Sequence, residues 1–169
     1  QAREANALLV TGCMRQVLGR DRSYKCNSLA FANPQAGYAG CYDKNILVPW
    51  IEFTPKSILR SLVGGSQGYS HGAARPVFDL SFGGESARCG ASICFETAFP
   101  EHYRAYMRSA EGPPDLFVHA GSEGQDPYLR LSKSLFVMAQ FRSIECRRPI
   151  VRNVVGGYSA WIDGCGRAT

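Results

Sequence analysis

The stretch Ala87-Arg-Cys-Gly-Ala-Ser-Ile-Cys-Phe95, followed shortly by Pro100-Glu101, decides the fold. An apolar run of this length after a Gly-Gly turn predicts a strand that is buried on both faces. Proline suits the first turn of a helix, and an acidic residue beside it suits the positive end of the helix dipole. The sequence therefore predicts a buried strand ending near Cys94, followed directly by a helix that begins at Pro100.

Further strands and one long helix are predicted on either side of this stretch. Turn residues such as Asn33-Pro34, Pro49 and Gly83-Gly84 separate apolar or alternating runs that are typical of strands. Strands are predicted at 8–13 (a buried one), 24–31, 38–48, 77–80, 115–120, 150–155 and 158–162, helices at 57–63, 100–112 and 127–148, and a loop at 64–76. Alternating strands and helices in the second half favour an α/β (α+β) fold, with helices on one face of a mixed sheet.

The long helix predicted at 127–148 has an apolar stripe. Leu131, Leu135, Met138 and Phe141 recur at steps of three and four residues, which places them on one helix face. We expect this face to pack on the core.

Composition and charge exclude several classes of protein. The chain has 169 residues, enough for one domain with a buried core. With 45% hydrophobic and 20% charged residues, its composition is that of an ordinary globular protein and argues against disorder. The net charge of +5 comes from scattered residues, and no basic run indicates nucleic-acid binding. A mildly basic solvated surface is the simplest interpretation, and attraction to phospholipid head groups is the alternative. No apolar stretch is long enough to span a membrane.

The cysteines point to thiol chemistry rather than to a metal site. There are seven, an odd number that cannot pair completely within the chain. No C-x-x-C motif occurs, and the three histidines have no zinc-ligand spacing. Most of the cysteines, including Cys13 and Cys89, are expected to be small core residues.

Cys94 and Lys44 are the candidate reactive pair. A thiol at a strand-to-helix turn faces a cleft, where backbone N–H groups stabilise a thiolate or an oxyanion. Lys44 lies among apolar and aromatic residues just before Pro49, which is an unusual place for a surface lysine. An ammonium held beside a thiol lowers the pKa of that thiol. The alternatives are a core cysteine and a lysine whose stem covers the core.

A family resemblance rests on these residues. The segment Tyr42-Asp-Lys44-Asn-Ile-Leu-Val-Pro-Trp-Ile-Glu52 resembles the lysine motif of apolipoprotein N-acyltransferases, a branch of the nitrilase (carbon–nitrogen hydrolase) superfamily. Ile93-Cys-Phe-Glu96 with Phe99-Pro-Glu101 resembles the nucleophile motif of that family, and Arg142 to Asn153 and Tyr158 to Arg167 are similar to its later segments.

The resemblance implies a nitrilase-like αββα sandwich and a Glu-Lys-Cys triad. Cys94 would be the nucleophile, Lys44 its charged partner, and Glu52 a second glutamate supporting the lysine. Phe95 would donate its backbone N–H to the oxyanion, and Glu96 would be a supporting residue. The alternative for Glu52 is a solvated turn carboxylate, and the alternative for Glu96 is a structural role in holding the turn. Because the chain begins at Gln1, within what reads as a helix end, we expect residues 1–169 to be a partial domain that lacks its N-terminal part. The general-base glutamate is then expected upstream of residue 1.

The activity implied by the resemblance is transfer of a fatty acyl group from phospholipid to the N-terminal amine of a lipoprotein, through a cysteine thioester. This chemistry requires no metal or organic cofactor. The implied location is the periplasmic side of the bacterial inner membrane, with membrane attachment through segments outside this chain.

One segment departs from the family pattern and keeps two alternatives open. Where the acyltransferases commonly carry an Asn-Asp-x-Trp-Phe-type sequence, this chain reads His119-Ala-Gly-Ser-Glu-Gly-Gln-Asp126. The first alternative is a soluble amidase of the same superfamily, acting on a small amide or N-carbamoyl compound. The second is an interaction module without activity.

Overall fold

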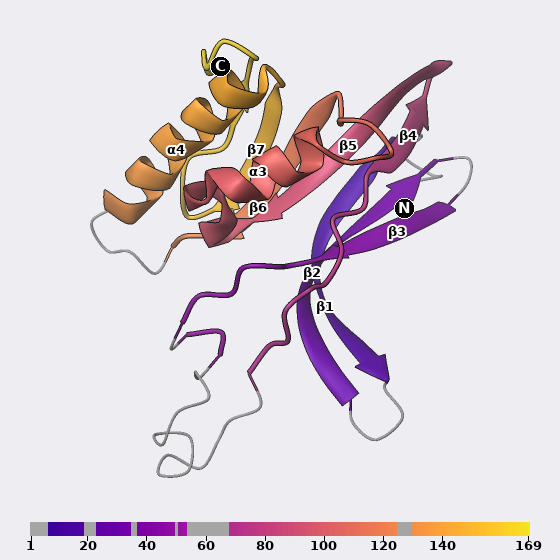
Figure 1. Ribbon diagram of the computed structural model, residues 1–169, viewed down its shortest axis with the longest axis vertical. Coiled ribbons are helices and arrows are strands. Elements are labelled where there is room, and N and C mark those ends of the chain that lie inside the picture. Colours follow the sequence, from indigo (N-terminus) through magenta and orange to yellow (C-terminus); the bar gives the residue numbers. More distant parts are fainter. Residues whose placement is uncertain (1–6, 19–22, 35–36, 50, 54–67, 125–129) are drawn as a thin grey trace.

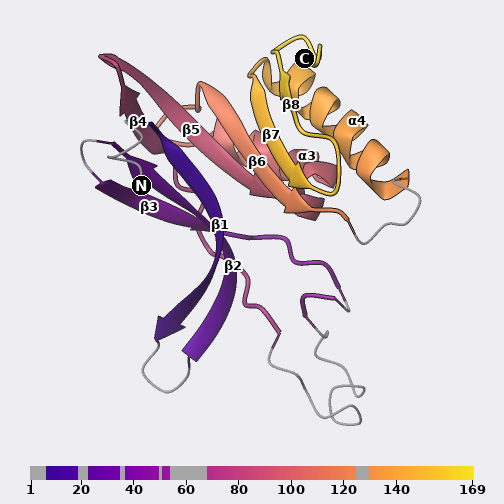
Figure 2. The same cartoon turned by 180° about the vertical axis from the view of Figure 1, so that it is seen from behind.

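The structure, a computed structural model, describes residues 7–18, 23–34, 37–49, 51–53, 68–124 and 130–169 (Figures 1 and 2). The described residues form two β-sheets and two α-helices. The first sheet consists of β1 (Leu9–Leu18), β2 (Ser23–Asn33) and β3 (Gly37–Asp43). The second consists of β4 (Phe78–Phe82), β5 (Glu85–Ile93), β6 (Leu116–Ser122), β7 (Ile150–Val155) and β8 (Ala160–Ile162).

The two sheets differ in strand direction. The first is antiparallel throughout. In the second, β5, β6 and β7 are parallel, while the outer strands β4 and β8 run antiparallel to their neighbours. The crossovers between the parallel strands contain the 3₁₀ turn η1 (Cys94–Ala98), α3 (Pro100–Met107) and α4 (Arg130–Cys146). This arrangement confirms the predicted mixed sheet and the strand that ends just before Cys94.

Two hydrophobic clusters define the layers. The first joins Leu29, Phe31 and Tyr42 of the first sheet to the second sheet, where Ala91 and Ile93 of β5 face it. The helices α3 and α4 lie on the other face of the second sheet (Figure 1). The second cluster joins them to that face and consists of Tyr103, Tyr106, Phe117, Ala139, Cys146, Ile150 and Ile162. Sheet, sheet and helices therefore follow one another as successive layers of the expected αββα order.

The prediction of a buried strand at 8–13 is wrong. The strand begins at Leu9 and continues to Leu18, and most of its side chains are exposed. Among the described strands, β1 pairs with β2 alone and lies at the edge of its sheet. An apolar sequence does not by itself show whether a second layer covers the strand. Cys13, expected in the core, is exposed for the same reason.

The apolar stripe of α4 does not form the core. Leu131, Met138 and Phe141 are 52%, 37% and 54% exposed, and only Leu135 is buried. The face of α4 toward the sheet consists of Ser132, Leu135, Ala139, Arg142, Ser143 and Cys146. Small and hydrogen-bonding residues occupy this face, where side chains of the helix donate hydrogen bonds to neighbouring segments. For example, Ser132 Oγ donates to Glu123, and Ser143 Oγ donates to the carbonyl of Asp163.

Smaller differences concern element ends. The third predicted strand stops at Asp43 instead of Val48, and α3 ends at Met107, well before the predicted 112. The predicted helix at 57–63 and residues 127–129 of the long helix lie outside the described residues. Among the described residues, no helix is both long and apolar enough to cross a membrane.

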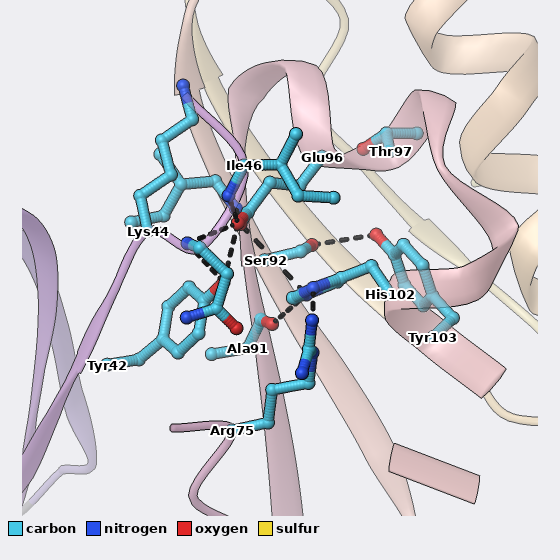
Figure 3. Close-up of polar contacts among 12 residues, drawn as sticks. Tyr42, Lys44, Ile46, Arg75, Ala91, Ser92, Glu96, Thr97, His102 and Tyr103 are labelled. Carbon is cyan, nitrogen blue, oxygen red and sulfur yellow. Dashed lines mark hydrogen bonds and ion pairs between the residues drawn. The ribbon is translucent and has the colours of Figure 1, made fainter. Parts of the chain in front are cut away.

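A buried carboxylate joins the two sheets beside the end of β5. Glu96 Oε1 accepts hydrogen bonds from the Tyr42 hydroxyl at 2.6 Å and from the backbone N–H groups of Asn45 and Ile46 at 2.7 and 2.9 Å. Its Oε2 accepts from the backbone N–H of Ile93 at 2.7 Å. Figure 3 shows Tyr42 and Ile46 beside the Glu96 carboxylate, with dashed lines that meet at its oxygen. One side chain of η1 therefore fixes the segment after β3 against the end of β5.

The first prediction concerns α4. Leu135→Ala should lower the free energy of unfolding of the intact protein by about 2–5 kcal/mol, because it removes a fully buried side chain and leaves a cavity. Phe141→Ala, on the exposed face of the same helix, should cost about 1 kcal/mol or less. Denaturant unfolding measures both, and equal losses would show that the face assignment is wrong.

The second prediction concerns the join between the sheets. Glu96→Gln should destabilise the protein by roughly 3 kcal/mol, because an amide turns N–H donors toward groups that are themselves donors. Tyr42→Phe removes one of the four donors and should cost about 1 kcal/mol. Thermal unfolding of the two variants is the measurement. A Glu96→Gln protein as stable as wild type would refute the structural role of this carboxylate.

Candidate active site

Cys94 lies where β5 passes into η1. Its backbone φ is +51°, in a region that residues other than glycine rarely occupy. Strained conformations of this kind persist only where the surroundings over-determine them, and they gather at functional sites. Gly121 of the neighbouring strand β6 lets this turn approach closely, since a β-carbon at 121 would lie 3.3 Å from Cys94 Cα. The strand-to-helix turn thus presents the thiol in a fixed direction.

Lys44 directly follows β3 of the first sheet and is only 1% exposed. Its Nζ donates to Oε2 of Glu52 at 2.5 Å. Glu52 also accepts from the backbone N–H of Val48 at 2.7 Å and from Asn27 Nδ2 at 2.9 Å. Burial raises the pKa of Glu52, but the hydrogen bonds from Lys44, Val48 and Asn27 and the charge of Lys44 outweigh it and lower the pKa. Glu52 therefore stays ionised and holds the ammonium in place.

A cavity of about 1540 Å³ between the sheets brings the candidate residues together. Cys94 and Phe95 line it from the second sheet, and Lys44 and Glu52 line it from the segment after β3. Apolar side chains from both sheets form most of the remaining wall. The residues that sequence analysis selected from two distant motifs thus face one space.

The thiol of Cys94 has opposing neighbours. Burial raises its pKa above the ordinary value, while the charge of Lys44 and a hydrogen bond from the backbone N–H of Phe95 lower it. The carboxylates of Glu52 and Glu123 raise it again, and the net direction is upward. The thiol is therefore mostly protonated at neutral pH, so its attack on a carbonyl requires a base to remove the proton.

The two supporting residues have different positions. Phe95 offers its backbone N–H to the thiol and lines the cavity, as an oxyanion donor must. The side chain of Glu96, a residue of η1, is fully buried and is not part of the cavity wall. Figure 3 shows the Lys44 side chain extending away from this carboxylate. Glu96 therefore acts on the backbone of the turn, and Glu52 on the lysine.

Sequence analysis missed Glu123 as a site residue. It follows β6, is almost fully buried and lines the cavity near Cys94. Its Oε1 accepts from Arg152 at 2.6 Å and its Oε2 from the hydroxyl of Ser132 at 2.5 Å. A signal was present, because the carboxyl ends of adjacent parallel strands meet at one edge of a sheet, where ligands gather. Glu123 lies in the segment His119–Asp126, which was noted in the sequence for lacking the Asn-Asp-x-Trp-Phe-type residues of the family and not for the residues that it contains.

The histidines serve as hydrogen-bonding residues at separate places. His71 Nδ1 lies 2.8 Å from the carbonyl of Asn45, and His102 Nε2 lies 3.0 Å from the carbonyl of Ala91. Among the residues that the structure describes, no group of three or more His, Cys, Asp or Glu is placed to hold a metal ion.

Comparison with known proteins gives related sequences along most of the chain. An apolipoprotein N-acyltransferase from Geobacter metallireducens is 32% identical over 174 residues, covering 98% of this chain and 31% of the relative. One from Nostoc sp. is 33% identical over 158 residues, covering 88% of this chain and 29% of the relative. The chain thus spans about a third of the length of these relatives.

Solved structures share the fold. An amidase from Nesterenkonia sp. covers 99% of this chain and 57% of its own, with a TM-score of 0.67 at 18% identity. A carbon-nitrogen hydrolase from Helicobacter pylori G27 covers 99% and 58%, with a TM-score of 0.69 at 13% identity. At these identities the similarity shows the fold alone. Residues 1–167 match the carbon-nitrogen hydrolase family, and the chain therefore belongs to that family.

Proposed function

We propose that this domain catalyses acyl transfer from a phospholipid to the N-terminal amine of a lipoprotein. One observation carries the proposal: a buried lysine from one sheet and a strained cysteine from the other line the same cavity. An ammonium held there by Glu52 favours a thiolate and a developing oxyanion. Relatives named apolipoprotein N-acyltransferase, matched over most of this chain, support the choice of acyl transfer.

The proposed reaction has two steps through Cys94. In the first, a base takes the proton of the thiol, and sulfur attacks the ester carbonyl of the phospholipid. The new C–S bond replaces the ester C–O bond, and the lysophospholipid leaves with a proton. In the second, the amine attacks the thioester, the C–N bond forms, and the C–S bond breaks to return the thiol.

Chain groups on both sides of the cavity have roles in these steps. Lys44 and the backbone N–H of Phe95 stabilise the oxyanion of each tetrahedral intermediate. Glu52 keeps the ammonium in position. The carboxylate of Glu52 already accepts hydrogen bonds from Lys44, Val48 and Asn27, so it is not assigned as the general base. In this proposal the general base is the glutamate that the family resemblance places upstream of residue 1.

The apolar character of the cavity suits a fatty acyl substrate. Most of its exposed wall is carbon, contributed by both sheets. An acyl chain lying there would place its carbonyl beside Cys94. In this proposal the whole protein works at the periplasmic face of the bacterial inner membrane, and it reaches the membrane through segments outside this chain.

The third prediction concerns the covalent step. Incubating the intact protein with phospholipid should add one acyl mass to the peptide that carries Cys94, and hydroxylamine should remove it, since thioesters are labile to hydroxylamine. Cys94→Ser should abolish the adduct, because a hydroxyl has a much higher pKa than a thiol. Mass spectrometry of the digested protein is the measurement.

Cys89→Ser is the matched control for this experiment. Cys89 lies on the same strand, but burial and the nearby charge of Asp115 raise the pKa of its thiol to about 12. Labelling should therefore persist in Cys89→Ser. If labelling is lost in Cys89→Ser and kept in Cys94→Ser, the nucleophile is wrongly assigned. If the wild type labels with a small amide and never with phospholipid, the protein is an amidase.

The fourth prediction uses the charges around the thiol. Alkylation of Cys94 by iodoacetamide should increase with pH, with a midpoint above that of a free thiol at about 8.5. Lys44→Ala should move the midpoint upward, since Lys44 lowers the pKa of the thiol. Glu52→Gln should move it downward, since Glu52 raises that pKa. Lys44→Ala should also slow acylation by at least about 100-fold. Shifts in the same direction for both variants would contradict this charge arrangement.

A further inference from the structure

A row of polar side chains crosses the second sheet directly behind the nucleophile turn. Ser92, His119 and Arg152 are register partners on β5, β6 and β7, and all three are buried. They lie on the face that the helices cover, since Ser92 Oγ bonds the hydroxyl of Tyr103 of α3 at 2.7 Å (Figure 3). Buried polar groups persist only when they are hydrogen-bonded, so the arrangement of this row is specific.

His119 is at the centre of the row and contacts one residue before Cys94 in the chain and one residue after it. Its Nδ1 lies 2.9 Å from the hydroxyl of Ser92, just before Cys94 in the chain. The same Nδ1 lies 2.9 Å from the hydroxyl of Thr97, just after Cys94 within η1. One ring nitrogen of His119 therefore connects the end of β5 to the 3₁₀ turn η1.

The conformation of Cys94 calls for such a connection. A φ of +51° at a cysteine relaxes unless contacts on both sides of the residue prevent it. Glu96 provides one constraint, by accepting the backbone N–H of Ile93. The contacts of His119 with the side chains of Ser92 and Thr97 provide a second constraint.

Charge is not what His119 supplies. Burial, followed by the charges of Arg152, His102 and Lys44, lowers the pKa of His119 well below its ordinary value. Arg152 is itself paired with Glu123 on the far side of the row. The imidazole is therefore neutral, and replacing it with another neutral group changes contacts near the thiol and leaves the local charge as it was.

We propose that His119 is a positioning residue that holds Cys94 in its reactive orientation, through its Nδ1 contacts with Ser92 and Thr97. The proposal rests on the proposed role of Cys94 as the nucleophile. It assigns a use to a histidine within the segment that departs from the family pattern. When these contacts are lost, the turn relaxes and the thiol moves away from Lys44 and the N–H of Phe95.

Three substitutions separate positioning from simple core filling. His119→Leu fills much of the volume and removes both contacts. His119→Asn places an amide atom at the position of Nδ1, so it restores the contacts although it fills less volume. Thr97→Val keeps the shape of the side chain and removes one hydroxyl, and it serves also if His119→Leu does not fold.

The experiment uses the intact protein and two readouts. The first is the rate at which phospholipid acylates Cys94, and the second is the pH midpoint of iodoacetamide labelling of Cys94, both followed on the peptide that carries it. We expect His119→Leu to slow acylation by about 100-fold, the typical effect of misplacing a reacting group by about 1 Å. Its labelling midpoint should move upward, as should that of Thr97→Val, while His119→Asn should keep most of the rate and the wild-type midpoint.

Ile150→Ala is the matched control for lost stability. Ile150 is fully buried at the start of β7, at the opposite end of the same sheet. It should lower the melting temperature while leaving the labelling midpoint unchanged. If the midpoints of all variants follow their melting temperatures, or if His119→Leu and Thr97→Val label as the wild type does, the positioning role is refuted. If phospholipid never acylates the wild type, the proposed acyl donor is wrong, and the labelling readout still decides the role of His119.

Discussion

The carboxylate of Glu96 and the groups that donate to it are the interaction on which the rest of this structure depends. Its donors come from β3, from the segment after β3 and from the end of β5, so they belong to both sheets. A buried carboxylate without partners is very costly, so losing the donors around Glu96 is unfavourable. The network therefore favours the register of the two sheets seen here. That register places Lys44 and Cys94 on opposite walls of one cavity.

Three buried carboxylates near this cavity each hold a different group in place. Glu96 fixes the backbone of the turn, Glu52 fixes the ammonium of Lys44, and Glu123 is paired with Arg152 beside the thiol. Each has a partner of its own, as buried charges require. Because Glu52 and Glu123 raise the pKa of Cys94 while Lys44 lowers it, the reactivity of the thiol depends on small changes of distance. This balance gives the residues that position Cys94 their importance.

Membership of the carbon-nitrogen hydrolase family agrees with this arrangement. A solved amidase and a solved carbon-nitrogen hydrolase share the fold at 18% and 13% sequence identity, so this similarity concerns the fold alone. In this chain His119, within β6, and Glu123, directly after β6, take part in buried hydrogen-bond networks.

The sequence by itself predicted the order of strands and helices in the second half, and it selected Cys94 and Lys44 as the candidate reactive pair. Such patterns are local: an apolar run, a proline at a helix start, and a charged residue among apolar ones are visible without knowing what packs where. Only the tertiary structure decided which faces are buried. It exposed β1 and the apolar stripe of α4, because burial depends on the neighbouring layer, and it turned the small polar face of α4 toward the sheet. It also revealed Glu96 as the join between the sheets, and Glu123 and His119 as neighbours of the thiol, since their partners are distant in sequence and meet only when the sheets and helices pack together.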